Sequence, residues 1–176
     1  MRDLELATFA GGCFWCTEAV FKRLNGVEKV IPGYSGGDSK SPTYEEDSLG
    51  ETNHAETIQI SFDPKSISYT DLVYIFFRTH DPTTKDKQGP DSGSQYRSVI
   101  FYHSKYQQRQ AEKEKAKAQN IYHFPVVTEI IPFESFYKAE EYHLDYYAKN
   151  PNKLYCRLVI DPKIKKLSEK FSNFVK

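Results

Sequence analysis

The stretch that decides the fold is residues 4–16, LELATFAGGCFWC. Its first part, residues 4–10, predicts a strand, and Gly11-Gly12 allows the backbone to turn tightly after it. A helix over residues 14–24 is predicted next, closed by Asn25-Gly26. Its apolar stripe repeats every four residues, at Cys16, Val20 and Leu24. The sequence therefore predicts a strand, a glycine turn and a helix, with a cysteine at the junction.

Cys13 is the residue at this junction. Unpaired N–H groups and the helix dipole favour an anion at a helix start. A thiolate in such a position has a depressed pKa and is the reactive form of cysteine. The alternative is that Cys13 is only a small buried hydrophobic residue, as free cysteines commonly are. We expect a reactive thiol at this position.

Cys13 and Cys16 also form a Cys-x-x-Cys pair, which fits several kinds of site. One is a thioredoxin-like redox pair. Another is half of a zinc site, although structural zinc needs four ligands and few others are available. A third is a cysteine hydrolase with a histidine as base. The histidines available for that role are His54, His80, His103, His123 and His143.

Strands and helices interleave along the rest of the chain. Further strands are predicted at 27–31, 56–62, 96–102, 126–131 and 155–160. Further helices are predicted at 70–79 (capped by Thr70), 104–120, 134–149 and 163–174. Two long polar loops are predicted, one that ends at Asn53 and contains one helical turn, and one that spans 80–95. Loops of this length in a compact domain are often functional. The order predicts an α+β fold, a two-layer αβ sandwich with a mixed sheet.

Composition narrows the class of protein. The 176 residues hold 24 Lys+Arg and 24 Asp+Glu, and this zero net charge argues against a nucleic-acid or membrane-surface binder. Three cysteines are an odd number, which does not suit a disulfide-stapled extracellular scaffold. The chain has no apolar run long enough to span a membrane and no secretory signal. We expect a single domain over 1–176, soluble and cytoplasmic.

Three further residues are candidates to surround a reactive thiol. In a strand that begins at residue 56, Glu56 shares the apolar face of Ile58 and Ile60. Desolvation there would raise its pKa toward neutral and make it a proton donor. If the strand begins one residue later, Glu56 is a solvated loop residue. Tyr44 and Tyr96 each adjoin a long loop, where functional sites concentrate.

Several motifs resemble those of type A peptide methionine sulfoxide reductases, in the same order and over essentially the whole chain. They are GGCFWCTEAVF at 11–21, YSGG at 34–37, PTYEE at 42–46, HAE at 54–56, HDPTT at 80–84, QGPDSGSQYRS at 88–98 and FYKAEEYHLDYY at 136–147. The resemblance implies a two-layer, ferredoxin-like sandwich. It also implies reduction of the S-epimer of methionine sulfoxide, free or in oxidised proteins, by a monomer without bound cofactor or metal. Regeneration would use an external thiol such as thioredoxin.

The resemblance assigns roles residue by residue. Cys13 matches the nucleophile, and Phe14 and Trp15 match the aromatic residues that hold the substrate methyl group. Glu56 matches the acid. The hydroxyl donors to the sulfoxide oxygen correspond to Tyr44 and Tyr96, and Asp91 matches a residue of the supporting hydrogen-bond network. The thiol would end as a sulfenic acid, the first step of cysteine oxidation.

Regeneration of this sulfenic acid is where the chain departs from many family members, because their glycine-rich tail with resolving cysteines is missing. Cys156 resembles their first resolving cysteine and is the leading candidate, although its apolar neighbours suit a buried cysteine. Cys16, one helical turn from Cys13, is the second candidate. Its apolar neighbour Val20 equally suits a cysteine that only packs in the core. A third possibility is that an external reductant acts directly on Cys13. Two loop differences, Ser48 and Asn53, do not touch the chemistry.

Overall fold

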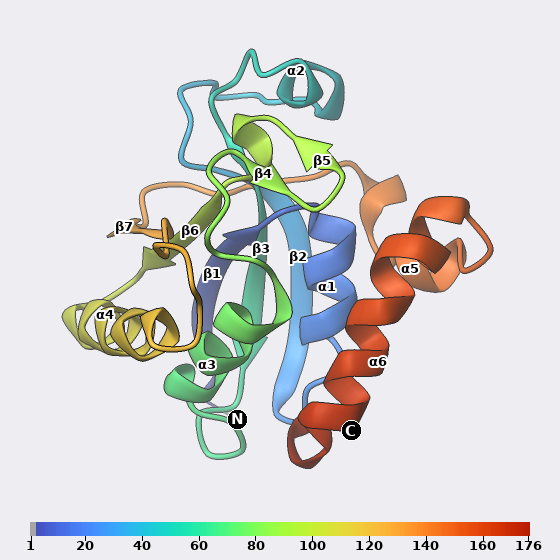
Figure 1. The fold of residues 1–176 in the computed structure, drawn as a ribbon. Helices are drawn as coiled ribbons and strands as arrows, with labels where there is room; N and C mark the ends of the chain where they lie inside the picture. Colours follow the sequence, from blue (N-terminus) through green and yellow to red (C-terminus); the bar gives the residue numbers. More distant parts are fainter. Residues whose placement is uncertain (1–2) are drawn as a thin grey trace.

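Six strands form one mixed sheet in this computed structural model, which describes residues 3–176 (Figure 1). The order across the sheet is β7-β6-β1-β3-β2-β8. The strands are β1 (Glu5–Gly11), β2 (Val27–Ser35), β3 (Ala55–Phe62), β6 (Ser98–Tyr102), β7 (Glu129–Pro132) and β8 (Tyr137–Lys138). Neighbours pair antiparallel except β6 and β7, which run parallel. A separate small hairpin pairs β4 (Lys87–Gln88) with β5 (Asp91–Ser92).

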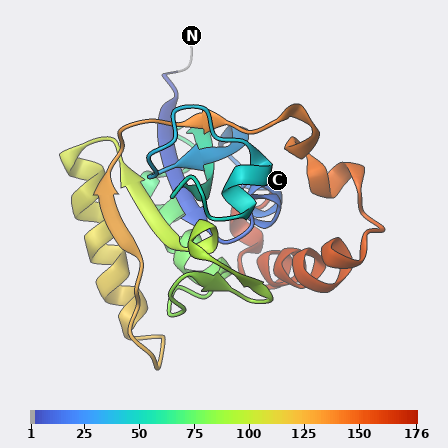
Figure 2. The same ribbon diagram turned by 90° about the horizontal axis from the view of Figure 1, so that it is seen from above.

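Helices α1 (Phe14–Phe21) and α3 (Tyr69–Thr79) pack against the sheet. α4 (Lys105–Gln119) lies beside α3, and α6 (Asp161–Lys170) beside α1 (Figures 1 and 2). Short helices α2 (Tyr44–Ser48) and α5 (Tyr146–Lys149) belong to the long connections. The chain order β1-α1-β2-β3-α3-β6, with central strands β6-β1-β3-β2, is the ferredoxin-like arrangement. The predicted two-layer sandwich is confirmed.

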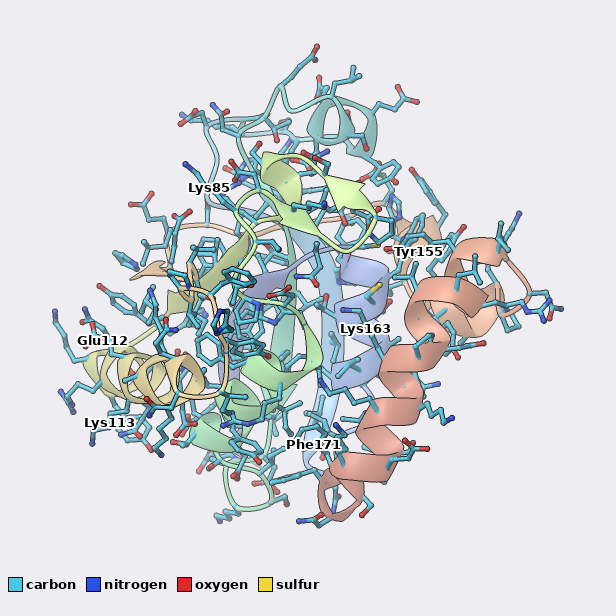
Figure 3. The ribbon with its side chains drawn as sticks, viewed as in Figure 1. Lys85, Glu112, Lys113, Tyr155, Lys163 and Phe171 are labelled. Carbon is cyan, nitrogen blue, oxygen red and sulfur yellow. The ribbon has the colours of Figure 1, made fainter. Side chains whose placement is uncertain are left out.

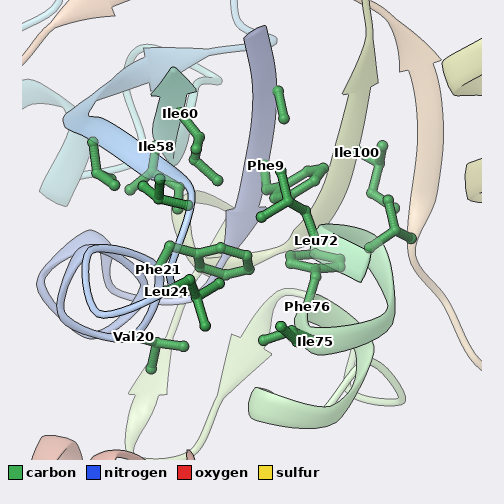
Figure 4. Close-up of a cluster of buried hydrophobic side chains, with 14 of the residues drawn as sticks. Phe9, Val20, Phe21, Leu24, Ile58, Ile60, Leu72, Ile75, Phe76 and Ile100 are labelled. Atoms are coloured by element: carbon green, nitrogen blue, oxygen red, sulfur yellow. The ribbon is translucent and has the colours of Figure 1, made fainter. Parts of the chain in front are cut away.

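The core lies between the sheet and the two helices (Figure 4). Phe9 of β1 packs on Phe21 of α1 and Phe76 of α3, with ring centroids 5.7 and 5.0 Å apart. Each such fully buried side chain contributes about 1.5–3 kcal/mol to stability by removal from water. This packing fixes α1 against β1 and β3, and so fixes the helix start that carries Cys13.

Two predicted elements are wrong. Residues 134–149 do not form one helix: the segment first adds β8 to the sheet edge, where Lys138 pairs with Gly33. It then forms a 3-10 turn at Glu141–His143, and Asp145 adopts a left-handed conformation (φ 55°) before α5. The unpaired edge of β2 thus captures part of a sequence whose local composition favours a helix.

Residues 155–160 are helical rather than a strand. Cys156 and Ile160 are both 0% exposed, whereas Leu154 and Leu158 are 71% and 66% exposed. In a strand all four would share one face, so this period of four identifies a helix. Cys156–Ile160 forms a π-helical turn that continues directly into α6. π-Helical turns are rare and are frequently found at functional sites.

Several boundaries also differ from expectation. α3 is capped by Ser68 rather than Thr70, in a capping box with Asp71. β2 extends beyond the predicted end to Ser35, and Ser94–Tyr96 is a 3-10 turn that precedes β6. The one helical turn expected before Asn53 is confirmed as α2. Within residues 3–176, no helix combines the length and apolar character needed to cross a membrane.

Candidate active site

The glycine turn brings Cys13 to the start of α1. Gly12 has φ +91°, and a Cβ there would lie 2.5 Å from Gln88 Cγ, so the position requires glycine. Cys13 is the N-cap of α1, but its side chain caps no backbone N–H. It is 7% exposed. The thiol is therefore free of the helix hydrogen bonds and nearly sealed from solvent.

Glu56 lies against the same helix start. β3 begins at Ala55, so Glu56 shares the inner face of the sheet and is 2% exposed. Its Oε2 accepts a hydrogen bond from the backbone N–H of Phe14 at 3.0 Å. That bond favours the ionised carboxylate, but burial dominates and raises the pKa well above the usual value for a glutamate. The predicted buried acid is confirmed.

The pKa predicted for Cys13 is wrong. Burial raises the pKa of this thiol well above the usual value, and the hydrogen bond with Cys16 and the charge of Glu56 raise it further. The main physical reason is burial, since a thiolate sealed from solvent loses its hydration. The backbone N–H of Phe14, at the helix start, is also occupied by the Glu56 carboxyl and does not stabilise a thiolate.

Tyr44 and Tyr96 reach the site from two different loops. Both are half-buried, Tyr44 at the start of α2 and Tyr96 at the end of the 3-10 turn before β6. Burial raises the pKa of Tyr44 to about 12 and that of Tyr96 higher still, with Glu56 and Cys13 contributing to both shifts. Both hydroxyls therefore stay protonated at neutral pH and are available as hydrogen-bond donors.

Tyr44 is held in place by Glu140. One carboxylate oxygen accepts the backbone N–H of Tyr44, and the other accepts the hydroxyl of Tyr34, each at 3.0 Å. Tyr34 is fully buried and pairs with Glu56 across β2 and β3. Glu140 therefore ties the α2 loop to the strand that lies beside Glu56.

Aromatic rings form one wall of the site. Trp15 stacks on Tyr146 with centroids 3.7 Å apart and planes 6° from parallel. Its Nε1–H donates to Nδ1 of His143 at 2.9 Å. Phe14, fully buried, packs against both Tyr44 and His143, whose rings also contact each other. These contacts hold the two rings of the Phe-Trp pair rigidly beside Cys13.

The other side of Cys13 holds a chain of polar groups. The Cys16 N–H donates to the Cys13 carbonyl at 3.1 Å, and Cys16 Sγ lies 3.5 Å from Tyr155 Oη. Tyr155 in turn donates to Asp91 Oδ2 at 2.6 Å. A cavity of about 20 Å³ lies among these four side chains and also touches Lys163. Tyr155 and Lys163 are labelled in Figure 3, on the C-terminal helical segment.

Cys156 packs in the same cluster as the other two cysteines, and all three are free thiols. It is 0% exposed and points inward from the π-helical turn. Burial raises the pKa of its thiol. The structure thus brings all three cysteines together, and of the other two it is Cys16 that contributes to the raised pKa of Cys13.

Two of the histidines considered as bases are engaged elsewhere. His80 binds Phe76 O and Ser98 Oγ with its two ring nitrogens, at 2.6 and 2.8 Å. Burial lowers the pKa of His80 to about 3, which keeps the ring neutral. His54 binds Gly37 N and Ser39 O. In the described part of the chain, no three His, Cys, Asp or Glu side chains gather in a way that would hold a metal ion.

One known protein family matches nearly the whole chain. The family model described as peptide methionine sulfoxide reductase matches residues 5–174. The chain belongs to this family. Its relatives include the methionine sulfoxide reductase MsrA of Sulfolobus acidocaldarius, 56% identical over 96% of both chains. MsrA of Thermus thermophilus is 51% identical over 98% of both chains.

Solved structures of the methionine sulfoxide reductase family share the fold. The reduced form of Mxr1 from Saccharomyces cerevisiae superposes with a TM-score of 0.80 at 40% identity, covering 87% of this chain and 89% of Mxr1. Methionine sulfoxide reductase A of Corynebacterium diphtheriae gives 0.79 at 32% identity, covering 87% of this chain and 78% of that one. Mxr1 has also been solved in complex with Trx2, with a TM-score of 0.57.

Sequence reasoning missed three residues of this reductase site, namely Glu140, His143 and Tyr155. Glu140 and His143 lie in the segment expected to be a continuous helix, and Tyr155 in the segment expected to be a strand. The usable signal was the i, i+4 pair Cys156 and Ile160, whose period indicates a helix with Tyr155 on the turn facing α1. The other residues predicted for the site converge on Cys13.

Proposed function

We propose that this chain reduces the S-epimer of methionine sulfoxide, free or in oxidised proteins, to methionine. The observation that carries the proposal is the meeting of a buried thiol with a buried carboxylic acid. Cys13 and Glu56 flank one helix start. The hydroxyls of Tyr44 and Tyr96 lie close enough for both groups to raise their pKa values. Thiol nucleophile, proton donor and two neutral hydroxyl donors are what sulfoxide reduction needs.

The proposed step balances as follows. Cys13 Sγ attacks the sulfoxide sulfur and forms a sulfur–sulfur bond with it. The protonated oxygen then passes to Cys13 Sγ as the substrate sulfur–oxygen bond and the new sulfur–sulfur bond both break, which releases the thioether and leaves Cys13 as a sulfenic acid. The sulfoxide is reduced to a thioether and the Cys13 sulfur is oxidised. Glu56 donates its proton to the oxygen and regains one from the Cys13 thiol. Donors aimed at the oxygen stabilise the charge that develops there.

The raised pKa values suit this step. Glu56 is protonated near neutral pH because burial raises its pKa. Cys13 is a thiol in the resting enzyme, and it loses its proton when a substrate oxygen can accept one. Two neutral groups side by side avoid the cost of a buried ion pair of like charge. The reactive thiolate would therefore form only with substrate in place.

Phe14 and Trp15 are proposed to receive the substrate methyl group. Methyl is apolar, and the stacked rings next to Cys13 supply an apolar wall. Tyr146 and His143 hold Trp15 from its face and its ring N–H. Asp91 is proposed to support the hydrogen-bond network through Tyr155.

Regeneration is proposed to use a second thiol, with Cys156 and Cys16 as candidates, or an external thiol acting directly on Cys13. The complex of yeast Mxr1 with Trx2 supports a thioredoxin-like protein as the external reductant. A single catalytic domain over 1–176, a monomeric state and a cytoplasmic location remain predictions from the sequence.

Epimerically pure substrates test the proposal. With dithiothreitol as reductant, the protein should convert methionine S-sulfoxide to methionine and leave the R epimer unchanged. Cys13→Ser should release no methionine from either epimer. Turnover of the R epimer alone, or full activity in Cys13→Ser, would refute the proposed function. Ester or amide hydrolysis without consumption of thiol would instead support the cysteine hydrolase.

A further inference from the structure

The polar chain on the far side of Cys13 has a defined direction. Tyr155 has one hydroxyl proton, which it donates to Asp91 Oδ2 at 2.6 Å. With that proton used, its oxygen acts as the acceptor in the contact with Cys16, whose Sγ lies 3.5 Å away. The order is therefore Cys16 S–H to Tyr155 Oη–H to the Asp91 carboxylate. It forms a path by which Cys16 can lose its proton.

We propose that Cys16 is the thiol that resolves the Cys13 sulfenic acid, and that Tyr155, held by Asp91, positions Cys16 and relays its proton. This inference rests on the proposed function, because that function produces the sulfenic acid. It assigns a role to Tyr155, for which the sequence predicted none. It also selects Cys16 over Cys156 for the first disulfide.

The step conserves atoms and electrons. Cys16 Sγ attacks Cys13 Sγ, a sulfur–sulfur bond forms, and the sulfur–oxygen bond of the sulfenic acid breaks. The Cys13 sulfur is reduced and the Cys16 sulfur is oxidised. The Cys16 proton passes through Tyr155 to Asp91, and Asp91, which lines the same cavity as Cys13, returns that proton to the departing hydroxide, which leaves as water. The thiolate is the attacking form, so removal of the Cys16 proton starts the step.

Three observations favour Cys16 as the attacking thiol. Cys13 and Cys16 share the first turn of α1, where the Cys16 N–H donates to the Cys13 carbonyl at 3.1 Å, and Cys-x-x-Cys pairs at helix starts are known to alternate between dithiol and disulfide. The Cys13 hydrogen bond and the positive charge of Lys163 lower the pKa of Cys16, whereas burial raises the pKa of Cys156. Burial also raises the pKa of Asp91, which makes it a better proton acceptor than a surface carboxylate.

The cavity beside these groups fits the leaving group. Its volume of about 20 Å³ is bounded by Cys13, Cys16, Asp91 and Tyr155. A site must offer roughly 10–15 Å³ and several polar partners to hold one water molecule. The product water of the resolving step would thus form next to a space of its own size, where Asp91 and Tyr155 offer hydrogen-bond partners.

Tyr155→Phe tests the inference because it removes only the hydroxyl and keeps the ring that packs edge-on against Trp15. One equivalent of methionine S-sulfoxide is mixed with reduced enzyme, and released methionine and free thiols are followed separately. In the wild type, one methionine forms and two thiols disappear. In Tyr155→Phe, the methionine burst should keep its wild-type amplitude of one methionine per enzyme, whereas disulfide formation should slow at least tenfold. Dimedone should then trap the sulfenic acid, and mass spectrometry should locate it on Cys13.

Two cysteine variants and a matched tyrosine complete the design. Cys16→Ser should accumulate the sulfenic acid, and Cys156→Ser should form the disulfide at nearly the wild-type rate. Tyr106→Phe removes the hydroxyl of an exposed tyrosine on α4 and should change neither step. The pH dependence of disulfide formation should flatten in Tyr155→Phe, an effect that loss of packing alone would not produce.

The outcomes separate the two proposals. No methionine burst in the wild type would overturn the proposed function. A normal burst with wild-type disulfide formation in Tyr155→Phe would overturn the inference alone. The inference also fails if Cys156→Ser, and not Cys16→Ser, blocks the loss of the second thiol.

Discussion

The two sides of Cys13 are built differently. On the sheet side, Glu56 is sealed at 2% exposure inside β3 and bound to the first residue of α1. On the opposite side, Asp91 and Tyr155 come from a two-residue strand and the C-terminal helical segment, and both are half-buried. The rigid side carries a protonated acid, and the looser side carries a chain that ends in a carboxylate. One sulfur therefore has a proton donor on one side and a proton acceptor on the other.

Glu56→Gln should give the largest effect, and only on the first step. Glutamine keeps the size and can still accept the Phe14 N–H, but it cannot transfer a proton. The single-turnover rate of methionine formation should fall by about 10²–10⁴-fold, the usual contribution of general acid catalysis. Rapid-quench measurement of released methionine reports it. The matched control is Glu18→Gln, at a second buried glutamate that lies on α1, and it should leave the rate unchanged.

The pH profile of the first step gives the sign of the Glu56 contribution. Burial raises the pKa of Glu56 well above the usual value for a glutamate, so the carboxyl is protonated below that raised pKa. The rate should fall as the pH increases through it, and Glu56→Gln should lack this fall. A wild-type rate that instead increased steadily over this range, with no falling limb, would contradict Glu56 as the proton donor.

The sheet side of the comparison was predictable from sequence, and the other side was not. Alternation along β3 fixed the face of Glu56 by a period of two, and Gly11-Gly12 fixed the junction that carries Cys13. Tyr155 was missed because residues 155–160 are rich in β-branched and aromatic residues, a local preference that packing against α1 overrides. The predicted direction of the Cys13 pKa shift was wrong because the shift depends on burial and on Glu56, which lies 43 positions away in sequence. Local pattern gives faces and turns, whereas charges depend on the finished packing.

Asp91→Asn should give the next largest effect, on the opposite side. Asparagine can still accept the Tyr155 hydroxyl proton in a hydrogen bond, but it is a far weaker base. Disulfide formation should slow about tenfold, a modest share of what general base catalysis contributes. The methionine burst should change by less than about threefold. Thiol titration after one equivalent of sulfoxide measures the first, and the burst measures the second. Equal losses in both steps would show that the two sides do not act separately.

Glu140→Gln should produce a smaller loss on the sheet side. Its two carboxylate oxygens accept from Tyr34 and from the backbone of Tyr44, and glutamine can accept with only one. Tyr44 should then be held less firmly, and the first step should slow about fivefold, as expected when a positioning contact is loosened. Single-turnover methionine formation should fall while disulfide formation stays at the wild-type rate. A loss confined to disulfide formation would place Glu140 on the wrong side of the comparison.

Glu18→Gln should leave both sides intact and change only stability. Burial raises the pKa of Glu18 to about 7, against an unfolded value of 4.5, so the folded protein binds this proton more tightly. The corresponding stability is fully present below about pH 4.5 and is lost as the pH increases through about 7. The whole Glu18 pKa shift corresponds to about 3 kcal/mol of unfolding free energy. Solvent screening reduces the expected contribution to about 1–2 kcal/mol.

Glutamine at position 18 keeps the oxygen that accepts the Asp145 N–H and carries no charge to desolvate. Its free energy of unfolding in denaturant should therefore exceed that of the wild type at pH 8 and match it at pH 4. A gap of equal size at both pH values would mean that the Glu18 proton is not involved. Cys13 and Cys16 lie at the start of α1, and Glu18 lies further along the same helix. An unchanged rate of methionine formation in this more stable variant would therefore show that the site depends on the helix start and not on the Glu18 charge.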